Sequence, residues 1–421
     1  MVCLAGALFA AAGCGGGSPE GGDGPVELRF GWWGNNDRAA ATQRVIDAFQ
    51  AKNPGIKIKG EFTDFNSYFD RLATQVAGSD APDVITLGGA YPREYGDRGA
   101  LLDLSTVSAD LKTDKIGEAA LGNGNFSDTQ YGVPTGVNAI ALIVDPVVFE
   151  KAGVPLPDTE TWTWDDFKRI AKEIADKSPE GTYGLADPTR TDMLDAFSRQ
   201  RGEALYTADG KVGIGQQTLV DWWNMTIELR DAKATPSASK TAELITQPAP
   251  EQSLIGRGLA GMQFDWSNQL TALRKASGHP LELRRVPGET GAKQAGMWLQ
   301  ASQLYTVNAK SEHPKEAAKF VDFLVNSPEA GEIILNDRGV SANSDVRAAV
   351  QAKLSPDDAA QVKFIDELTP KAGPPLVIGP TGSTDTPKIL DRINAEVLFD
   401  KRAPADAAAE FIKQVTAVIA Q

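Results

Sequence analysis

The sequence predicts an α/β fold with a mostly parallel sheet, because strand-like runs alternate with stretches of helical periodicity along the chain. In residues 26–30, apolar side chains occupy every second position, as they do in a half-buried strand. In residues 38–49, Val45, Ile46 and Phe49 share one face of a helix, which ends at the breaker sequence KNPG. A strand followed by a helix is therefore the first unit of the predicted fold.

The same alternation continues through the next part of the chain. Residues 56–62 alternate apolar and polar side chains, and residues 65–76 repeat apolar residues at helical spacing. Residues 81–87 then return to a strand-like run. A second region of the same kind begins at NAIALIVD, residues 138–145. We therefore expect a second α/β region to start there.

The later elements follow from local signals. Thr163 and Asp166 stand three residues apart at the start of a helical stripe, which is typical of a capping box. Residues 259–264 and 296–307 are rich in apolar and aromatic side chains and are predicted strands. Beyond residue 312 the spacing of apolar side chains is mostly helical, so we expect a helical C-terminal region.

The composition narrows the class of function. A chain of 421 residues has room for two or three domains, and a hydrophobic content of 42% is that of a globular protein. The formal net charge of -14 disfavours binding to nucleic acid, which needs clustered Lys and Arg side chains. We therefore expect no nucleic-acid partner.

The N-terminus is typical of a bacterial lipoprotein signal. Residues 4–13 form an apolar run too short to span a bilayer, and AAGC at residues 11–14 places small residues before a cysteine. We predict a signal peptide over residues 1–14 that ends at a lipidated Cys14, followed by a flexible tether over residues 15–25. The alternative is an ordinary cleaved signal with an incidental cysteine. Both interpretations predict an exported protein.

The sequence carries no recognisable motif for catalysis, for a cofactor or for a metal ion. His279 and His313 have no second histidine or cysteine at ligand spacing, so we expect no metal site. No G-x-S-x-G elbow, Walker loop or complete dinucleotide fingerprint is present. We therefore predict no catalytic residues and no cofactor. A pair of glycosidase carboxylates is defined only in space, so a hydrolase stays open at this point.

Large aromatic side chains follow several of the predicted strands. Trp32 and Trp33 are neighbours in extended chain, so they point to opposite faces and at most one of them enters the same core. Ligands of open α/β sheets bind beyond the carboxyl ends of the strands, where an aromatic ring can stack on a sugar. The aromatic residues that we place there are one of Trp32 and Trp33, with Tyr68, Tyr91, Trp266 and Trp298. Asn35, Asn138 and Asp265 are predicted to bind hydroxyl groups, although Asp265 could instead cap the following helix.

A series of longer segments gives the chain a family resemblance. In order, these segments are AFQAKNPGIKI, SYFDRLATQVAGSDAPDVITL, YGDRGALLDLS, YGVPTGVNAIALIVDPVVFEKAGV, TWTWDDFKRIAKEI, HPKEAAKFVDFLVNSPEAGEIIL and EVLFDKRAPADAAAEFIKQV. Through them, nearly all of residues 25–420 resembles the extracellular solute-binding proteins of ATP-binding-cassette (ABC) sugar importers, the group that includes maltose-binding protein. The order of the segments carries the resemblance more than any one of them does.

The resemblance implies a two-lobe periplasmic-binding-protein fold, type II-like, with the ligand in a cleft between the lobes. It implies chain crossings near residues 137–139, 300–303 and 341–344. The N-lobe would then comprise residues 26–138 and 303–343, and the C-lobe residues 139–302 and 344–421. Such lobes close over the ligand by a hinge motion and present the closed form to a membrane permease.

The resemblance also implies ligand-binding positions in this chain. The loop after the first strand contributes Trp32, Trp33 and Asn35, and the segment FTDFNSYFD contributes Asp64 and Tyr68. The hinge contributes Asn138, and the second lobe contributes Asp265, Trp266 and Trp298. Many relatives carry an acidic residue after the DVITL strand, where this chain has Gly88 and Gly89, followed by Tyr91. The missing carboxylate leaves room for a larger or differently oriented glycan.

These observations lead to one expected function and two alternatives. We expect a monomeric, lipid-anchored binding protein on the extracellular face of the membrane, in a Gram-positive bacterium, that delivers a sugar or oligosaccharide to an ABC permease. A binding protein for a quaternary amine or an amino sugar is the first alternative, because tryptophans can also surround a cation. A secreted glycoside hydrolase is the second alternative, and it would differ by turning its ligand over.

Overall fold

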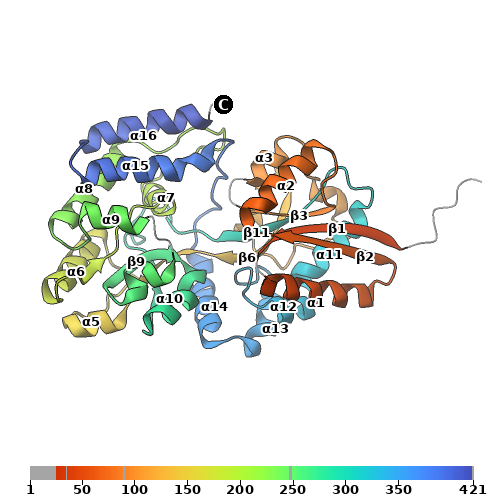
Figure 1. Ribbon diagram of the computed structural model, residues 1–421, viewed down its shortest axis with the longest axis horizontal. Coiled ribbons are helices and arrows are strands. Elements are labelled where there is room, and N and C mark those ends of the chain that lie inside the picture. Colours follow the sequence, from red (N-terminus) through yellow and green to blue (C-terminus); the bar gives the residue numbers. More distant parts are fainter. Residues whose placement is uncertain (1–24, 35, 89–90, 246–248, 420–421) are drawn as a thin grey trace, which may run out of the picture.

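The computed structural model describes residues 25–34, 36–88, 91–245 and 249–419, and it confirms the α/β fold. Its two main sheets lie in separate halves of the molecule (Figure 1). We call the half with the five-stranded sheet the N-lobe and the half with the four-stranded sheet the C-lobe. The predicted signal peptide with Cys14, most of the predicted tether, Asn35 and Gly89 lie outside the described residues.

The N-lobe sheet has the strand order β2-β1-β3-β11-β6. Strands β1, β2 and β3 pair in parallel, whereas β11 runs antiparallel to both of its neighbours. The mostly parallel sheet that the sequence predicts is therefore interrupted by the strand that enters from the other lobe. The strands are β1 (Val26–Trp33), β2 (Ile56–Thr63), β3 (Val84–Leu87), β6 (Gly132–Asn138) and β11 (Gln300–Val307).

The C-lobe sheet has the strand order β10-β7-β9-β8 and is mixed. Strand β7 runs antiparallel to both neighbours, and only β8 and β9 pair in parallel. The C-lobe sheet is mixed because β7 follows β6 directly, so it enters this sheet from the other lobe. The strands are β7 (Ile140–Val144), β8 (Tyr183–Leu185), β9 (Ala260–Trp266) and β10 (Glu282–Arg284), and a separate ribbon joins β4 (Asn125–Phe126) to β5 (Thr129–Gln130).

Helices surround both sheets (Figure 1). The N-lobe helices are α1 (Asn36–Lys52), α2 (Phe65–Ala77), α3 (Tyr91–Gly96), α4 (Glu118–Leu121), α11 (Pro314–Asn326), α12 (Pro328–Ile334) and α13 (Ser344–Val350). The C-lobe helices are α5 (Pro146–Ala152), α6 (Trp164–Lys177), α7 (Thr191–Gln200), α8 (Gln216–Asp231), α9 (Ala238–Ile245), α10 (Leu270–Ser277), α14 (Pro356–Leu368), α15 (Thr386–Leu398) and α16 (Pro404–Ile419). Within the described ranges, no helix is both long and apolar enough to cross a bilayer.

One predicted helix start is formed as the sequence indicates. Thr163 is the N-cap of α6, and its hydroxyl accepts a hydrogen bond from the backbone N–H of Asp166. The Asp166 carboxylate in turn accepts one from the backbone N–H of Thr163, which completes the predicted capping box. The buried face of α6 carries Phe167, Ile170 and Ile174, as the helical spacing predicts.

The first two passages between the lobes lie beside each other. The chain leaves the N-lobe sheet after β6 and enters β7 through the buried Ala139. It returns through Leu299 and begins β11 at Gln300, which pairs with Asn138. Residues 300–302 are therefore part of the N-lobe sheet, whereas the expected division assigned them to the C-lobe.

The third passage differs from the expectation as well. The Asn343 side chain caps α13 and donates a hydrogen bond to Asn326 Oδ1 of α11 (2.7 Å). A methyl group on Gly331 of α12 would overlap the side chain of Val346, so α12 and α13 pack closely. Helix α13 therefore belongs to the N-lobe. The chain crosses in residues 351–355, after the position near 344 that we expected.

Candidate functional site

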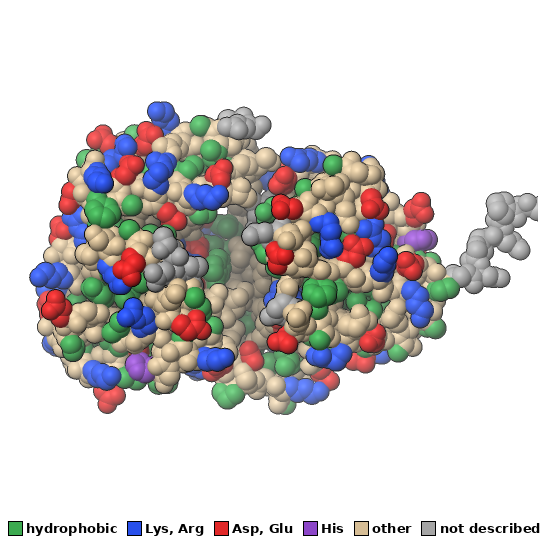
Figure 2. Space-filling model, in the orientation of Figure 1, with side chains coloured by type: hydrophobic (Ala, Val, Ile, Leu, Met, Phe, Trp, Pro, Cys, Tyr) green, Lys and Arg blue, Asp and Glu red, His purple; other side chains and the backbone are tan. Residues whose placement is uncertain are grey.

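A cavity of about 470 Å³ lies between the two lobes. Figure 2 shows the hollow between the halves of the molecule. The C-lobe contributes the start of α7, the end of β9 and Trp298, and the N-lobe contributes Asn138 and the start of β11. A third contribution comes from the segment between α14 and α15. The lining residues with large or polar side chains are Asn123, Asn138, Thr191, Asp192, Asp195, Tyr206, Trp266, Asn268, Gln269, Trp298, Gln300, Ser302 and Ser383.

Two of the predicted tryptophans meet in this cavity. The rings of Trp266 and Trp298 are arranged edge to face, with centroids 6.2 Å apart and an angle of 81° between their planes. Trp298 is almost fully buried, and its Nε1 donates a hydrogen bond to Gln300 Oε1 (2.9 Å). Trp266 is only half-buried. The pair thus offers the ring of Trp266 to the cavity, with Trp298 behind it.

The hinge positions a third predicted residue at the same cavity. Asn138 ends β6, and its Nδ2 donates a hydrogen bond to Ser302 Oγ (2.8 Å). Its Oδ1 is buried and has no hydrogen-bond partner among the described residues. A buried acceptor without a partner destabilises a fold by about 1–3 kcal/mol. Asn138 therefore presents an acceptor that a ligand hydroxyl could satisfy.

The polar wall of the cavity is neutral to acidic. Among the described residues that line it, none is Lys, Arg or His. Asp195 is buried and accepts hydrogen bonds from the backbone N–H of Leu205 (2.8 Å) and from Ser198 Oγ (3.2 Å). Burial raises the pKa of Asp195. Asp192 is held by two hydrogen bonds from Arg190, at 2.9 and 2.8 Å. No positive side chain is therefore available in the described wall for an anionic ligand.

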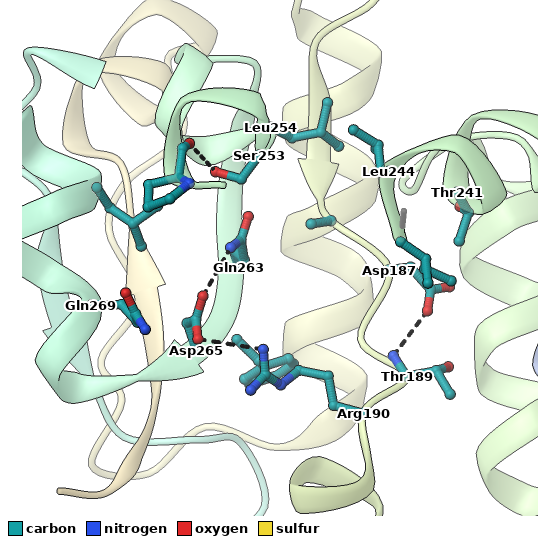
Figure 3. Close-up of a pocket in the computed structure, with 15 residues that line it drawn as sticks. Asp187, Thr189, Arg190, Thr241, Leu244, Ser253, Leu254, Gln263, Asp265 and Gln269 are labelled. Atoms are coloured by element: carbon teal, nitrogen blue, oxygen red, sulfur yellow. Dashed lines mark hydrogen bonds and ion pairs between the residues drawn. The ribbon is translucent and has the colours of Figure 1, made fainter. Parts of the chain in front are cut away.

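Asp265 faces a second, smaller cavity inside the C-lobe. This cavity measures about 320 Å³ and is lined by residues from the segment before α7, from α9 and from β9 (Figure 3). The Asp265 carboxylate accepts hydrogen bonds from Arg190 Nη1 and from Gln263 Nε2, both at 3.3 Å. Burial raises its pKa, and Arg190 opposes that shift. Asp265 therefore lines the C-lobe cavity, whereas Trp266 lines the interlobe cavity, and the contact of Asp265 with a ligand stays a prediction.

Arg190 links the two cavities. Its guanidinium lies between Asp192, which lines the interlobe cavity, and Asp265, which lines the C-lobe cavity. Gln269 lines both cavities. The predicted helix cap by Asp265 is not formed, since its Oδ1 accepts the backbone N–H of Trp266 (2.8 Å). Asp265 instead fixes the end of β9, and so the position of the Trp266 backbone.

The neighbouring tryptophans after the first strand are divided between two environments. Trp32 is buried in the N-lobe core, where its ring stacks on Phe62 at 5.8 Å and lies 4.9 Å from Phe30. Trp33 is half-buried and contacts Phe65 edge to face at 5.4 Å. A Cβ atom on Gly88 would lie 3.2 Å from the Trp33 ring, so Gly88 allows this ring to lie across the end of β3. Trp32 is therefore the core residue of the pair.

The remaining predicted N-lobe residues have structural roles in this arrangement. Tyr68 is buried, and its hydroxyl lies 3.0 Å from the carbonyl oxygen of Thr86 and 3.2 Å from that of Gly31. The phenol of Tyr68 is therefore used inside the N-lobe, which corrects its assignment to the ligand. Asp64 is exposed and caps α2 by accepting a hydrogen bond from the backbone N–H of Ser67 (3.1 Å). Tyr91 is half-buried and stacks on Phe69. None of Trp33, Asp64, Tyr68, Gly88 and Tyr91 lines the interlobe cavity.

Sequence reasoning missed several residues that line the cavity. Asp192, Asp195 and Tyr206 come from α7 and the loop that follows it, and residues 376–379 come from the loop before α15. No periodic pattern marks these positions, because only the tertiary fold brings them together. The one available signal was the sequence AGPPLVIGP, whose Gly and Pro content is typical of an irregular segment.

Comparison with known proteins agrees with this architecture. A lipoprotein of Streptomyces antibioticus is 27% identical over 402 residues, which are 89% of this chain and 86% of the relative. The diacetylchitobiose binding protein DasA of Streptomyces coelicolor is 25% identical over 431 residues, 97% of this chain and 95% of the relative. The solved structure of an extracellular solute-binding protein family 1 member from Alicyclobacillus acidocaldarius is 27% identical, with a TM-score of 0.80 over 95% of this chain and 100% of that one.

The family itself follows from a match along most of the chain. The sequence profile of the family described as "Bacterial extracellular solute-binding protein" matches residues 33–331. That match includes the whole C-lobe sheet, the N-lobe sheet apart from residues 26–32 of β1, both tryptophans of the interlobe cavity and the first two passages between the lobes. This chain therefore belongs to the bacterial extracellular solute-binding proteins, which bind solutes for ABC transporters and are not enzymes.

Proposed function

We propose that this protein captures a neutral oligosaccharide in the interlobe cavity and delivers it to an ABC permease. One observation carries the proposal: an edge-to-face tryptophan pair lies in a cavity whose described wall holds no Lys, Arg or His. An uncharged sugar needs an aromatic face and hydrogen-bonding partners, but no counter-ion. An acidic sugar or a phosphate would need a positive partner that this wall does not offer.

The chemistry of the wall matches the two kinds of surface on a sugar ring. The C–H face of a pyranose can stack on the half-buried ring of Trp266. Hydroxyl groups both donate and accept hydrogen bonds, and Asn138, Gln300 and Ser302 supply both functions from the N-lobe side. A ligand that touches Trp266 and Asn138 together contacts both lobes. Its binding energy therefore favours the arrangement in which the lobes are close.

The size of the cavity and one relative support the same ligand class. A volume of about 470 Å³ lies within the range of about 300–1,000 Å³ that small-molecule sites occupy. The relative from Streptomyces coelicolor is named for its binding of diacetylchitobiose, which is a neutral disaccharide. We infer a neutral sugar of two or more units for this protein as well.

A second candidate ligand is a cationic amine or amino sugar. Asp192 and Asp195 line the same cavity as Trp266 and Trp298, and aromatic rings together with carboxylates can hold a cation. Asp192 is already paired with Arg190, and Asp195 with backbone and hydroxyl donors. Both carboxylates therefore have their charge partly satisfied without a ligand, and for this reason we prefer the neutral sugar.

We propose that the protein works at the outer face of the membrane, held there by lipid on Cys14. The lipoprotein of Streptomyces antibioticus supports an anchor of this kind. Fractionation of cells that express the wild type and Cys14→Ser tests it. We expect the wild type in the membrane fraction and the variant in the soluble fraction, and equal distribution of the two would contradict the lipid anchor.

Thermal unfolding against a ligand panel tests the ligand class. The chain without residues 1–14 is heated alone and with neutral oligosaccharides, uronic-acid oligosaccharides, amino sugars, betaine and choline. A ligand at a hundredfold excess over Kd stabilises the folded state by about 2.7 kcal/mol. We expect the midpoint to rise with a neutral oligosaccharide. A rise with the amines alone would favour the second candidate, and a rise with uronates alone would contradict both.

A further inference from the structure

The segment of residues 373–379, which we call the strap, runs along the boundary between the lobes. It leaves the C-lobe after α14 and returns to that lobe at α15, and Figure 1 shows it passing between the two halves. Its last four residues line the interlobe cavity. The strap is not one of the three passages that join the two sheets, yet it contacts both lobes.

The strap is firmly seated on the C-lobe. The backbone N–H of Gly373 donates to the carbonyl oxygen of Met297 (2.8 Å), and Arg199 Nη2 donates to the carbonyl oxygen of Pro374. A Cβ atom on Gly373 would lie 2.6 Å from the carbonyl oxygen of Ala295, so only glycine fits at this position. Two hydrogen bonds and a close backbone approach therefore fix the start of the strap.

Arg199 connects the start of the strap to the tryptophan pair. Its side chain is buried, and its guanidinium lies 5.3 Å from the ring centroid of Trp298. The same guanidinium donates to the strap at Pro374. Arg199 therefore contacts both the strap and the ring of Trp298. A shift of the strap on the C-lobe would move Arg199 and so change the packing around Trp298.

The contacts of the strap with the N-lobe are weaker. Pro375 packs on Gly122, where an added Cβ would lie 2.5 Å from Pro375 Cγ. Ile378 is half-buried against the apolar cluster of the N-lobe, and its carbonyl oxygen accepts a long hydrogen bond from Arg93 Nη1 (3.4 Å). These are two side-chain contacts and one weak hydrogen bond. A hinge motion that separates the lobes would therefore break the N-lobe contacts and leave the strap on the C-lobe.

We propose that the strap is a latch that favours the close arrangement of the lobes before any ligand binds, and that it thereby sets ligand affinity. The contacts of Pro375 and Ile378 with the N-lobe stabilise this arrangement of the lobes and not an open one. The apparent Kd is the intrinsic Kd divided by the fraction of molecules in the binding-competent state. Weakening the latch therefore lowers that fraction and raises the apparent Kd. The effect on affinity rests on the proposed sugar site, whereas the effect on lobe separation does not.

Two substitutions weaken the N-lobe contacts from opposite sides. Ile378→Ala removes apolar contact from the strap, and Gly122→Ala places a methyl group where Pro375 packs. The matched controls are Leu156→Ala, an exposed leucine of the C-lobe, and Gly117→Ala, where an added Cβ meets nothing within 4 Å. Ile378→Val is a milder variant that keeps the latch testable if Ile378→Ala does not fold.

The separation of the lobes is measured without ligand. Cys3→Ser and Cys14→Ser remove both native cysteines from the full chain, and spin labels at Thr74→Cys on α2 and Lys388→Cys on α15 report the distance between the lobes. Both labelled positions are exposed. We expect Ile378→Ala and Gly122→Ala to shift the distance distribution to longer values, and the two controls to leave it unchanged. An unchanged distribution in both latch variants would overturn the proposal, whatever the ligand is.

The affinity measurement is made on the same proteins, with diacetylchitobiose as the probe. We expect the Kd of both latch variants to rise about fivefold over that of the controls, because a smaller fraction of the free protein is binding-competent. If the latch variants show a longer lobe distance but the wild type does not bind diacetylchitobiose, the latch is supported and the proposed ligand class is contradicted. A longer lobe distance with unchanged Kd would overturn the link between the latch and affinity.

Discussion

The ring of Trp298 stands edge to face behind the ring of Trp266, with centroids 6.2 Å apart. The two residues belong to different chain segments, and both are close to a passage between the lobes. Trp266 ends β9 and Trp298 precedes β11 by two residues. Hydrogen bonds from Trp298 to Gln300 and from Ala301 N–H to Asn123 Oδ1 (3.0 Å) tie this wall to the hinge. Trp298 is therefore held at the point where the chain passes from the C-lobe into β11 of the N-lobe.

Trp266→Ala is expected to weaken sugar binding at least about tenfold, which corresponds to about 1.4 kcal/mol. The variant loses the aromatic face, while the half-buried position limits the cost to the fold. Calorimetric titration with the neutral oligosaccharide from the ligand panel measures the change. Trp266→Phe keeps a smaller ring and should bind with intermediate affinity. An unchanged Kd in Trp266→Ala would remove this residue from the site.

Trp32→Ala is expected to destabilise the protein by about 3–5 kcal/mol, because it empties a large volume in the N-lobe core. The Nε1 of Trp32 is buried without a partner among the described residues. Trp32→Phe removes this unpaired donor along with part of the ring, so we expect it to destabilise less than half as much. Denaturant unfolding measures both variants. A loss of ligand affinity in correctly folded Trp32→Phe would contradict the placement of Trp32 in the core.

Asn138→Ala is expected to reduce affinity more than stability. The substitution removes an unpaired buried acceptor, which offsets the lost hydrogen bond to Ser302. If a ligand hydroxyl normally pairs with Asn138 Oδ1, binding should weaken by about 1–3 kcal/mol. Calorimetry and denaturant unfolding on one preparation separate the two effects. Ser302→Ala breaks the same internal hydrogen bond and leaves the Asn138 acceptor in place, so it is the control for stability. It is not a control for affinity, because Ser302 also lines the cavity.

Asp195 should make the stability of the fold depend on pH. Burial raises its folded-state pKa above the unfolded value near 3.9, so the folded state binds the proton more tightly. The contribution of Asp195 to stability is therefore largest at low pH and falls as pH rises from about 4 through the raised pKa. The free energy of unfolding of the wild type, minus that of Asp195→Asn, should decrease across this range. A flat difference would contradict the raised pKa.

The sequence predicted those parts of the fold that local patterns determine. The alternation of residues 26–30, the helical stripe before KNPG and the Thr163–Asp166 capping box all depend on near neighbours, and each is formed. The antiparallel strands β7 and β11 could not be predicted in this way, because their direction is set by crossings between the lobes. The boundary near residue 344 failed for a related reason, since the packing of α13 on α12 is a tertiary contact.

Three of the residues that we predicted to bind a ligand lie together, and their role in binding stays a prediction. Trp266, Trp298 and Asn138 line one cavity, as the positions of aromatic and amide side chains at strand ends suggested. Tyr68 was predicted to contact the ligand, but its ring is buried among apolar residues of the N-lobe, and two carbonyl oxygens lie near its hydroxyl. The alternation rule states that Trp32 and Trp33 face opposite ways, yet it cannot say which side is the core. Packing on Phe62 and Phe30 decides that Trp32 is the buried one.

The most direct test of the central claim compares a neutral disaccharide with the disaccharide that carries carboxylates in place of its C6 hydroxymethyl groups. Calorimetric titration of the wild type with a neutral disaccharide and with its uronic-acid counterpart measures whether the interlobe cavity selects an uncharged sugar. We predict binding of a neutral sugar from the panel and at least about tenfold weaker binding of the acidic counterpart, because the described wall offers no positive side chain. Equal or tighter binding of the uronic acid would contradict the account.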